Sequence, residues 1–161
     1  MDADAKKRLL RKVPYGLYAA CTRSDRGEQH IFLLSWLTQA SFEPPIVACG
    51  IHRASRSHAN LSSEGTAVLA LNLLAIEQQG LATEILKAPS FKADTVAGTP
   101  YRPGKNGCAL LTETLGALEA EVVDRAEAGD HTVFVCKVTD AHQFRNGEPL
   151  THASTGWKYA G

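Results

Sequence analysis

Polar and ring-bearing side chains gather in residues 35–57, and their types could bind a flat polar heterocycle beside a phosphate group. The first half carries hydroxyl, amide and aromatic groups among small residues, at Ser35, Trp36, Leu37, Thr38, Gln39, Ala40 and Ser41. The second half carries imidazole, guanidinium and hydroxyl groups, at His52, Arg53, Ala54, Ser55 and Ser57. Pro44 and Pro45 separate the halves, and each removes a backbone donor. The segment therefore predicts two adjacent polar loops, one for a ring system and one for a phosphate.

Backbone N–H groups are the expected donors in both loops. A strand that breaks at Ser35 leaves N–H groups without ladder partners, and these can pair with the acceptors of a heterocycle. The apolar run 46–51 leads to a short helix near Ser57, where unpaired N–H groups and the helix dipole favour an anion. Arg53 adds a guanidinium that can bind a phosphate through two hydrogen bonds. Ordinary loop polarity and a solvated surface cluster are the alternatives for the two halves.

The composition narrows the class of protein. Seventeen Lys and Arg residues balance seventeen Asp and Glu residues in a chain of 161, so no overall field favours nucleic acid or an anionic membrane. No apolar run approaches the roughly 20 residues of a membrane span, and the charged start lacks the apolar core of a signal peptide. We expect one cytoplasmic domain over residues 1–161 without a nucleic-acid or membrane partner.

The cysteines and most histidines give no signal for a metal. The cysteines are widely spaced without a CxxC pair, which indicates reduced packing residues: Cys21, Cys49, Cys108 and Cys136. Four histidines show no ligand spacing with Asp or Cys: His52, His58, His142 and His152. We therefore assign no metal ligand.

Short strands with inserted helices account for the rest of the chain. Strands are expected over 13–22, 30–36, 46–51, 66–73, 109–112, 117–124, 132–141 and 150–154, with 46–51 buried on both faces. Helices are expected over 4–12, 57–65 and 76–87. Residues 90–107, rich in Gly and Pro, predict a long ordered excursion outside the core, with Phe91 and Lys92 its most distinctive pair. The order of elements favours a mainly β fold with inserted helices, closed as a small β-barrel.

Several motifs carry a resemblance to a known family. SWLTQASFEPPIVACGI resembles the strand, flavin loop and Glu-Pro-Pro stop of flavin reductase-like proteins, and NLLAIEQQGLA, NGCALL, LEAEV, GDHTVFVCKV and TGWKY follow in that family's order. The resemblance runs from about Val13 to Tyr159 and is greatest to the C-terminal flavin reductase domain of cyanobacterial flavodiiron proteins. It implies an FMN-binding split β-barrel of Greek-key topology and a homodimer with flavin at the subunit interface.

The resemblance also implies an activity and roles for residues. It implies an NAD(P)H:flavin oxidoreductase, in which hydride passes from NAD(P)H to bound FMN, or FAD, and electrons leave to free flavin, oxygen or a protein acceptor. It places the flavin loop on 35–41, the phosphate segment on 50–57 and a further flavin contact on Phe91 and Lys92. His131 would orient the nicotinamide carboxamide or stabilise reduced flavin.

Two aromatic residues near the C-terminus have an expected role, and two other functions stay open. Trp157 and Tyr159 would help to cover the flavin of a partner subunit. An FMN electron-transfer protein reduced by a protein donor is one alternative. A non-catalytic flavin-binding module is the other.

Overall fold

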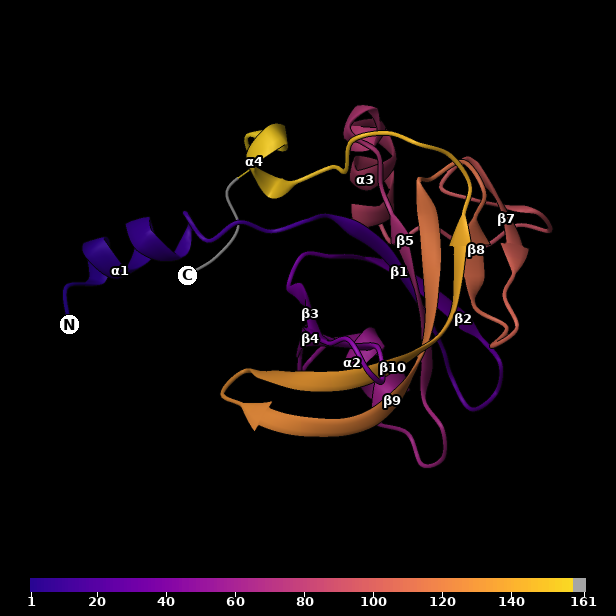
Figure 1. Cartoon of the computed structure of the whole chain (residues 1–161), viewed down its shortest axis with the longest axis horizontal. Coiled ribbons are helices and arrows are strands. Elements are labelled where there is room, and N and C mark those ends of the chain that lie inside the picture. Colours follow the sequence, from indigo (N-terminus) through magenta and orange to yellow (C-terminus); the bar gives the residue numbers. More distant parts are fainter. Residues whose placement is uncertain (158–161) are drawn as a thin grey trace.

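The computed structural model describes residues 1–157 and confirms a mainly β fold with inserted helices (Figure 1). The strands are β1 (Tyr18–Arg23), β2 (Gln29–Leu34), β3 (Leu37–Ser41), β4 (Ile46–His52), β5 (Val68–Leu73), β6 (Thr95–Val96), β7 (Thr99–Pro103), β8 (Ala109–Leu111), β9 (Gly116–Ala128) and β10 (His131–Gln143). The helices are α1 (Ala3–Leu10), α2 (Arg56–Leu61), the 3₁₀ turn η1 (Ile76–Gln78), α3 (Gln79–Leu86) and α4 (His152–Thr155).

Seven strands form one curled antiparallel sheet in the order β2-β1-β5-β9-β10-β4-β3. Its two edge strands, β2 and β3, are joined by only Ser35 and Trp36. Two linking residues span at most about 11 Å, whereas the edges of a flat seven-stranded sheet would lie about 29 Å apart. The sheet must therefore curl until its edges approach each other at this corner. No ladder joins β2 to β3 among residues 1–157, so the sheet stays open and the predicted closure is not shown.

The long β9–β10 hairpin extends away from strands β7 and β8 (Figure 1). Each of its strands has 13 residues, and the ladder is interrupted between Val135 and Cys136 and again between Val138 and Asp140. Such irregularities bend a strand pair, because one strand carries an extra residue. Gly129, with φ of 68°, occupies the first position of the two-residue turn, as a type II′ turn requires.

The core lies on both faces of the central strands. Leu69, Leu71 and Phe134 are fully buried inside the curl. On the outer face, α3 covers β1 through Ala82 and Ile85, which pack with Ala19 and Ile31. Strand β1 is consequently buried on both faces, whereas β4 buries only alternate residues, so the prediction that 46–51 is buried on both faces is wrong. The four cysteines are buried and free, which confirms them as packing residues.

Three predicted segments have a different structure. Residues 90–107 contain β6 and β7, which pair with each other, and β7 also pairs with β8 to complete a second, three-stranded sheet, so they are not an excursion without strands. Residues 150–154 do not form a strand: Thr151 makes one bridge to Gly16 and then caps α4. Residues 37–41 form the edge strand β3 rather than an unpaired loop, because they pair with β4 through a bulge after Gln39.

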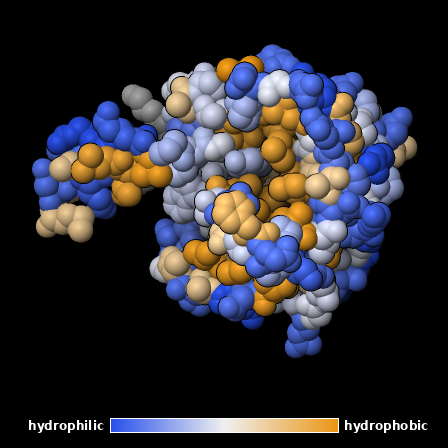
Figure 2. Space-filling model, viewed as in Figure 1, coloured by the Kyte–Doolittle hydropathy of each residue, from blue (hydrophilic) through white to orange (hydrophobic). Residues whose placement is uncertain are grey.

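Helix α1 projects from the body near the N-terminus (Figure 1) and buries none of its residues. Leu9, Leu10 and Val13 are exposed there. Figure 2 shows hydrophobic surface along this helix and in a hollow at the middle of the body. No helix within residues 1–157 is long and apolar enough to cross a membrane.

Candidate functional site

A cavity of about 700 Å³, here called the corner cavity, lies where β2, the Ser35–Trp36 corner, the end of β4 and helix α4 meet. Its apolar wall consists of Leu17, Phe32, Leu33, Leu34, Ile51 and Leu86. Its polar and ring-bearing wall consists of His30, Ser35, Trp36, His52, Ser55, Ser57, His131, His152 and Trp157. The volume falls within the roughly 300–1,000 Å³ of small-molecule sites. The cavity lining contains no Lys, Arg, Asp or Glu within residues 1–157. Histidines alone can therefore give this wall a positive charge.

Trp36 forms one side of the corner cavity. Its ring packs over Gly50, where an added Cβ would lie 3.1 Å from Trp36 Cε3. The Gly50 N–H donates to the Trp36 carbonyl at 2.9 Å, and the Trp36 ring lies 4.5 Å from the His131 ring, tilted by 41°. The sequence places glycine where the indole needs close contact with β4, so Trp36 is held as a wall of the cavity.

His131 enters the corner cavity from the first position of β10. Its Nδ1 lies 2.7 Å from Asp130 Oδ1, and hydrogen bonding from His131 lowers the pKa of Asp130. On its other side the ring meets His52 edge-on, with centroids 5.1 Å apart. The Ala54 N–H donates to His52 Nδ1 at 3.2 Å, so neutral His52 carries its proton on Nε2. The two imidazoles at this end of the cavity thus have defined tautomers.

The predicted phosphate segment reaches the corner cavity through its serines. Ser55 caps α2, its Oγ accepting from the His58 N–H at 3.1 Å, and Ser57 is buried against the cavity. The Arg53 guanidinium instead pairs with Glu127 at 3.2 Å, where both side chains are more than half exposed. Arg53 and Ala54 do not line the cavity. Of this segment, the structure therefore brings His52, Ser55 and Ser57 together around the cavity.

The predicted ring-binding segment divides at the corner. Ser35 and Trp36 line the cavity, whereas Leu37, Thr38, Gln39, Ala40 and Ser41 lie on β3 outside it. The expectation that 37–41 lacks ladder partners is wrong, since β4 pairs with it. An edge strand is nevertheless paired on one side only, so alternate N–H groups of β3 point away from β4. Their role as flavin donors stays a prediction.

The remaining predicted contacts are spread over the molecule. Phe91 packs on Tyr101, with centroids 5.4 Å apart, and Lys92 joins Thr95 through its backbone, so both belong to the small sheet and not to the cavity. Trp157 lines the cavity. Tyr159 lies outside the described residues.

Sequence reasoning missed the apolar wall and two histidines. His30 and Phe32 project from one face of β2, and the alternation of residues 30, 32 and 34 is the signal that could have found this wall. Burial lowers the pKa of His30, and the charge of Arg56 lowers it further, so His30 is neutral at pH 7. His152 is 8% exposed, and its Nε2 is buried without a hydrogen-bond partner in the described part of the chain. His152 gave no sequence signal, because only the fold brings α4 beside β2.

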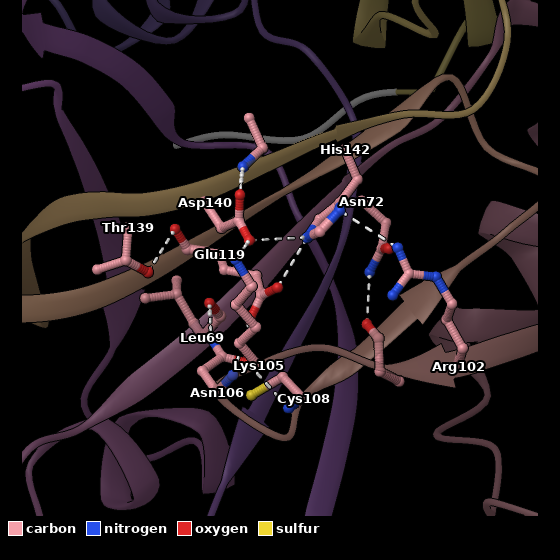
Figure 3. Close-up of polar contacts among 12 residues, drawn as sticks. Leu69, Asn72, Arg102, Lys105, Asn106, Cys108, Glu119, Thr139, Asp140 and His142 are labelled. Atoms are coloured by element: carbon pink, nitrogen blue, oxygen red, sulfur yellow. Dashed lines mark hydrogen bonds and ion pairs between the residues drawn. The ribbon is translucent and has the colours of Figure 1, made fainter.

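A second polar region, here called the carboxylate cluster, lies on β9 and β10 (Figure 3). It consists of Glu119, Asp140 and His142 with their cationic neighbours Arg102 and Lys105. Glu119 is 1% exposed, and its two oxygens accept from the Asn106 N–H and from His142 Nε2, each at 2.8 Å. Burial raises the pKa of Glu119, but these hydrogen bonds outweigh it and leave the pKa below its ordinary value. Glu119 thus stays ionised although it is buried.

The protonation of His142 decides whether this cluster can hold a metal. Arg102 Nη2 lies 3.2 Å from His142 Nδ1, and a guanidinium can only donate, so Nδ1 accepts and Nε2 carries the proton of the neutral ring. The three ligand atoms lie within 4.8 Å of one another, but a cation there would have to displace that proton and Lys105, which is 2.7 Å from Asp140. The charges of Arg102 and Lys105 already balance those of Glu119 and Asp140. We interpret the cluster as a structural network.

Comparisons with known proteins give the family of the chain. The family model described as "Flavin reductase like domain" matches residues 10–161. The diflavin flavoprotein A 1 of Synechocystis sp. is 34% identical over 144 residues, covering 87% of this chain and 24% of that protein, so the chain spans about a quarter of it. The ferric-chelate reductase (NAD(P)H) of Archaeoglobus fulgidus is 26% identical over 158 residues, covering 95% of this chain and 88% of that one. The NADH:FAD oxidoreductase SgcE6 of Streptomyces globisporus superposes with a TM-score of 0.81 at 20% identity, covering 99% and 88% of the two chains, which supports the fold.

Proposed function

The chain belongs to the flavin reductase like family, and on this basis we propose that it is an oxidoreductase that binds FMN in the corner cavity and reduces it with NAD(P)H. The observation that carries the proposal is the cavity itself, in which an apolar wall, aromatic and imidazole rings and serine hydroxyls meet at one corner. The relative from Archaeoglobus fulgidus is named as an NAD(P)H-dependent reductase and supports the same donor here. We extend the proposal to a split β-barrel, with β2 and β3 as the edges of the split.

The residues of the corner cavity match the chemical groups of FMN. The planar ring needs apolar and aromatic walls, which Phe32, Leu34 and Trp36 provide. The ring acceptors need N–H donors, which the outward edge of β3 offers. The phosphate needs hydroxyl and cationic groups, which Ser55, Ser57 and the adjacent Arg53 supply once Arg53 leaves Glu127. FAD has the same ring system and would make the same contacts with the cavity wall. A competition experiment that compares the affinities of FMN and FAD separates the two flavins.

The chain's own residues position and shield the reactants. When bound, FMN supplies the hydride acceptor and the route by which electrons leave. Leu17, Phe32 and Leu86 exclude water from the cavity, and Trp36 limits the space above Gly50. His131 lies beside Trp36, where its ring can orient the carboxamide of a nicotinamide. Hydride transfer needs face-to-face contact of the two rings more than an acid–base pair, so this division of roles is sufficient.

A homodimer with flavin at the subunit interface completes the proposal. Phe91 and Lys92 do not line the corner cavity of their own chain, so we place them against the flavin of a second copy. The exposed Leu9, Leu10 and Val13 of the projecting N-terminal segment are apolar surface that an interface would cover. Light scattering should give twice the chain mass, and Lys92→Ala should weaken FMN binding. A monomer that binds FMN with unchanged affinity in the Lys92 variant contradicts the dimeric site.

Anaerobic reduction tests the activity directly. The protein reconstituted with FMN is mixed with NADH or NADPH in the absence of oxygen, and its visible absorption is followed. We expect the yellow colour to bleach with at least one of the two. A flavin that remains oxidised with both contradicts the reductase activity and leaves only the flavin site.

A second candidate is an electron-transfer protein that receives electrons from another protein. The observation in its favour is the relationship to a diflavin flavoprotein, of which this chain matches only about a quarter. The two functions differ in which donor reduces the flavin faster. A reduced ferredoxin or rubredoxin that outpaces NADH and NADPH would favour the second candidate.

A further inference from the structure

The hairpin turn next to His131 contains a carboxylate to which the sequence assigned no role. Asp130 is the second of the two turn residues between β9 and β10, and its side chain is 80% exposed. The His131 side chain is only 13% exposed, since it enters the corner cavity between Trp36 and His52. The two residues join through Asp130 Oδ1 and His131 Nδ1 at 2.7 Å. An exposed carboxylate thus contacts the hidden ring nitrogen of a cavity residue.

The direction of this hydrogen bond fixes the tautomer of His131. An ionised carboxylate only accepts, so the proton of the neutral ring must lie on Nδ1. The hydrogen bond from His131 also lowers the pKa of Asp130, which keeps the carboxylate ionised at neutral pH. Nε2 makes no hydrogen bond to any of residues 1–157. It is therefore the ring nitrogen with free capacity for a ligand of the cavity.

The backbone of Asp130 ties the same turn to the end of the neighbouring strand β4. Its carbonyl accepts from the Arg53 N–H at 3.0 Å, at the point where β4 ends and the phosphate segment begins. Gly129, with φ of 68°, allows the turn that places both groups of Asp130. A change of the side chain leaves this backbone link in place, so the two contributions of Asp130 can be separated by substitution.

We propose that Asp130 is a positioning residue that acts through His131: its carboxylate holds the proton on Nδ1 and presents a bare Nε2 to the nicotinamide carboxamide. The carboxamide N–H is a donor, so a bare Nε2 can accept from it and hold the nicotinamide ring against the flavin. This inference rests on the proposed function for its ligand, but the tautomer itself is a property of the protein alone.

The test uses variants of Asp130 in the full chain. Asp130→Asn keeps the shape of the side chain but adds an amide that can donate to Nδ1, and Asp130→Ala removes the partner. Asp130→Glu keeps a carboxylate and should restore function in part. Asp124→Asn is the matched control, because it removes an exposed carboxylate from the same hairpin whose hydrogen bond is to the adjacent Arg125 N–H. Denaturation midpoints confirm that each variant is folded.

Two readouts separate this inference from the proposed function. Imidazole ¹⁵N shifts of the protein without ligand should show His131 protonated on Nδ1 in the wild type and in Asp124→Asn, and on Nε2 in Asp130→Asn. The rate constant of anaerobic reduction by the better of NADH and NADPH should fall about tenfold in Asp130→Asn, while FMN affinity stays within about twofold. Asp130→Ala should lower that rate constant as well, and it replaces Asp130→Asn in the test if that variant does not fold.

Different results overturn different parts. An unchanged Nδ1–H tautomer in Asp130→Asn overturns the inference, as does a changed tautomer with an unchanged rate constant. A wild-type protein that has the expected tautomer but is reduced by neither nucleotide contradicts the proposed function and, with it, the reactive role of Asp130.

Discussion

The corner cavity and the carboxylate cluster both contain histidines positioned by β10, yet they use polar groups in opposite ways. In the cluster, the buried Glu119 accepts two hydrogen bonds, and both nitrogens of His142 have partners. In the cavity, His152 Nε2 lacks a partner within residues 1–157, and no residue of that range bonds to His131 Nε2. Buried polar groups are usually paired, and an unpaired one costs free energy. The difference indicates that the cluster stabilises the fold and that the cavity keeps capacity for a ligand.

The backbone around the two regions supports the same distinction. Gly104 lies against Glu119, where an added Cβ would come within 2.6 Å of Oε2, so the loop closes tightly over the carboxylate. Gly50 has a similar function for Trp36, but the space beside that ring stays open as the cavity. Close packing thus fills one region, whereas it forms only the wall of the other.

The largest effect is expected from Glu119→Gln. The new amide keeps one acceptor oxygen, so its NH2 group would meet either the Asn106 N–H or the protonated His142 Nε2, and two donors would then oppose each other. Loss of one partner of a buried pair costs about 3 kcal/mol of unfolding free energy. Urea denaturation measures this loss. FMN affinity of the folded variant should change by less than about twofold, because the cluster does not line the cavity.

Glu121→Gln is the control for that variant. Glu121 lies on the same strand, two residues away and only partly buried, so its substitution should change the unfolding free energy by no more than about 0.5 kcal/mol. The comparison between the two regions fails if Glu119→Gln lowers FMN affinity tenfold while its stability is unchanged.

The loss of unfolding free energy in Glu119→Gln should depend on pH, and this dependence tests the structural role of the carboxylate cluster. The pKa of Glu119 is lower in the folded protein than in the unfolded chain, because hydrogen bonds outweigh burial. Its stabilisation is therefore present above the unfolded value of about 4.3 and is lost as the pH falls through the folded pKa. Urea denaturation at a series of acid pH values should show the wild type and Glu119→Gln converging towards low pH. A difference that grows on acidification would mean that Glu119 is protonated in the folded protein.

In the cavity region, Arg53→Ala should act on binding and not on stability. A charge-assisted phosphate contact contributes about 1.5 to 3 kcal/mol, so the FMN dissociation constant should rise about tenfold to a hundredfold. The exposed pair with Glu127 contributes at most about 1 kcal/mol to folding. Fluorescence titration measures the affinity.

Arg56→Ala is the matched control for Arg53→Ala, because Arg56 forms an equally exposed pair with Glu28. Its FMN affinity should stay within about twofold of the wild type. Unchanged affinity in Arg53→Ala would show that the phosphate lies elsewhere.

The smallest effect is expected from Ser55→Ala, which should change both the stability of the fold and the affinity for FMN. Loss of the cap of α2 should lower the unfolding free energy by about 1 kcal/mol. Loss of a neutral hydroxyl contact should raise the FMN dissociation constant only severalfold, by about 0.5 to 1.5 kcal/mol. Denaturation and titration of the same sample measure both. A loss of stability with no change in affinity would limit Ser55 to capping.

Local patterns predicted the elements, but not the groups that the chain brings together over long distances. The hairpin at Gly129 and the antiparallel pairing of β1 with β2 follow from turn residues and alternation, and the structure confirms both. The strand β3 was missed because its polar residues lie on a sheet edge, where polar side chains are tolerated. β6 and β7 were missed because Gly and Pro in short strands look like a loop.

The candidate site was predicted where its residues are close in the sequence. Ser35, Trp36, His52 and Ser55 were found in this way. His152 joins the cavity only through the pairing of the chain near Gly16 with Thr151, which no local pattern encodes. The carboxylate cluster was missed for the same reason, since its members come from two long strands and a loop.

A crystal structure of the protein with FMN tests the central claim most directly. We expect the flavin ring in the corner cavity between β2 and the Trp36 corner, with the phosphate at Ser55 and Ser57. An empty cavity, or FMN bound at the carboxylate cluster instead, would contradict it.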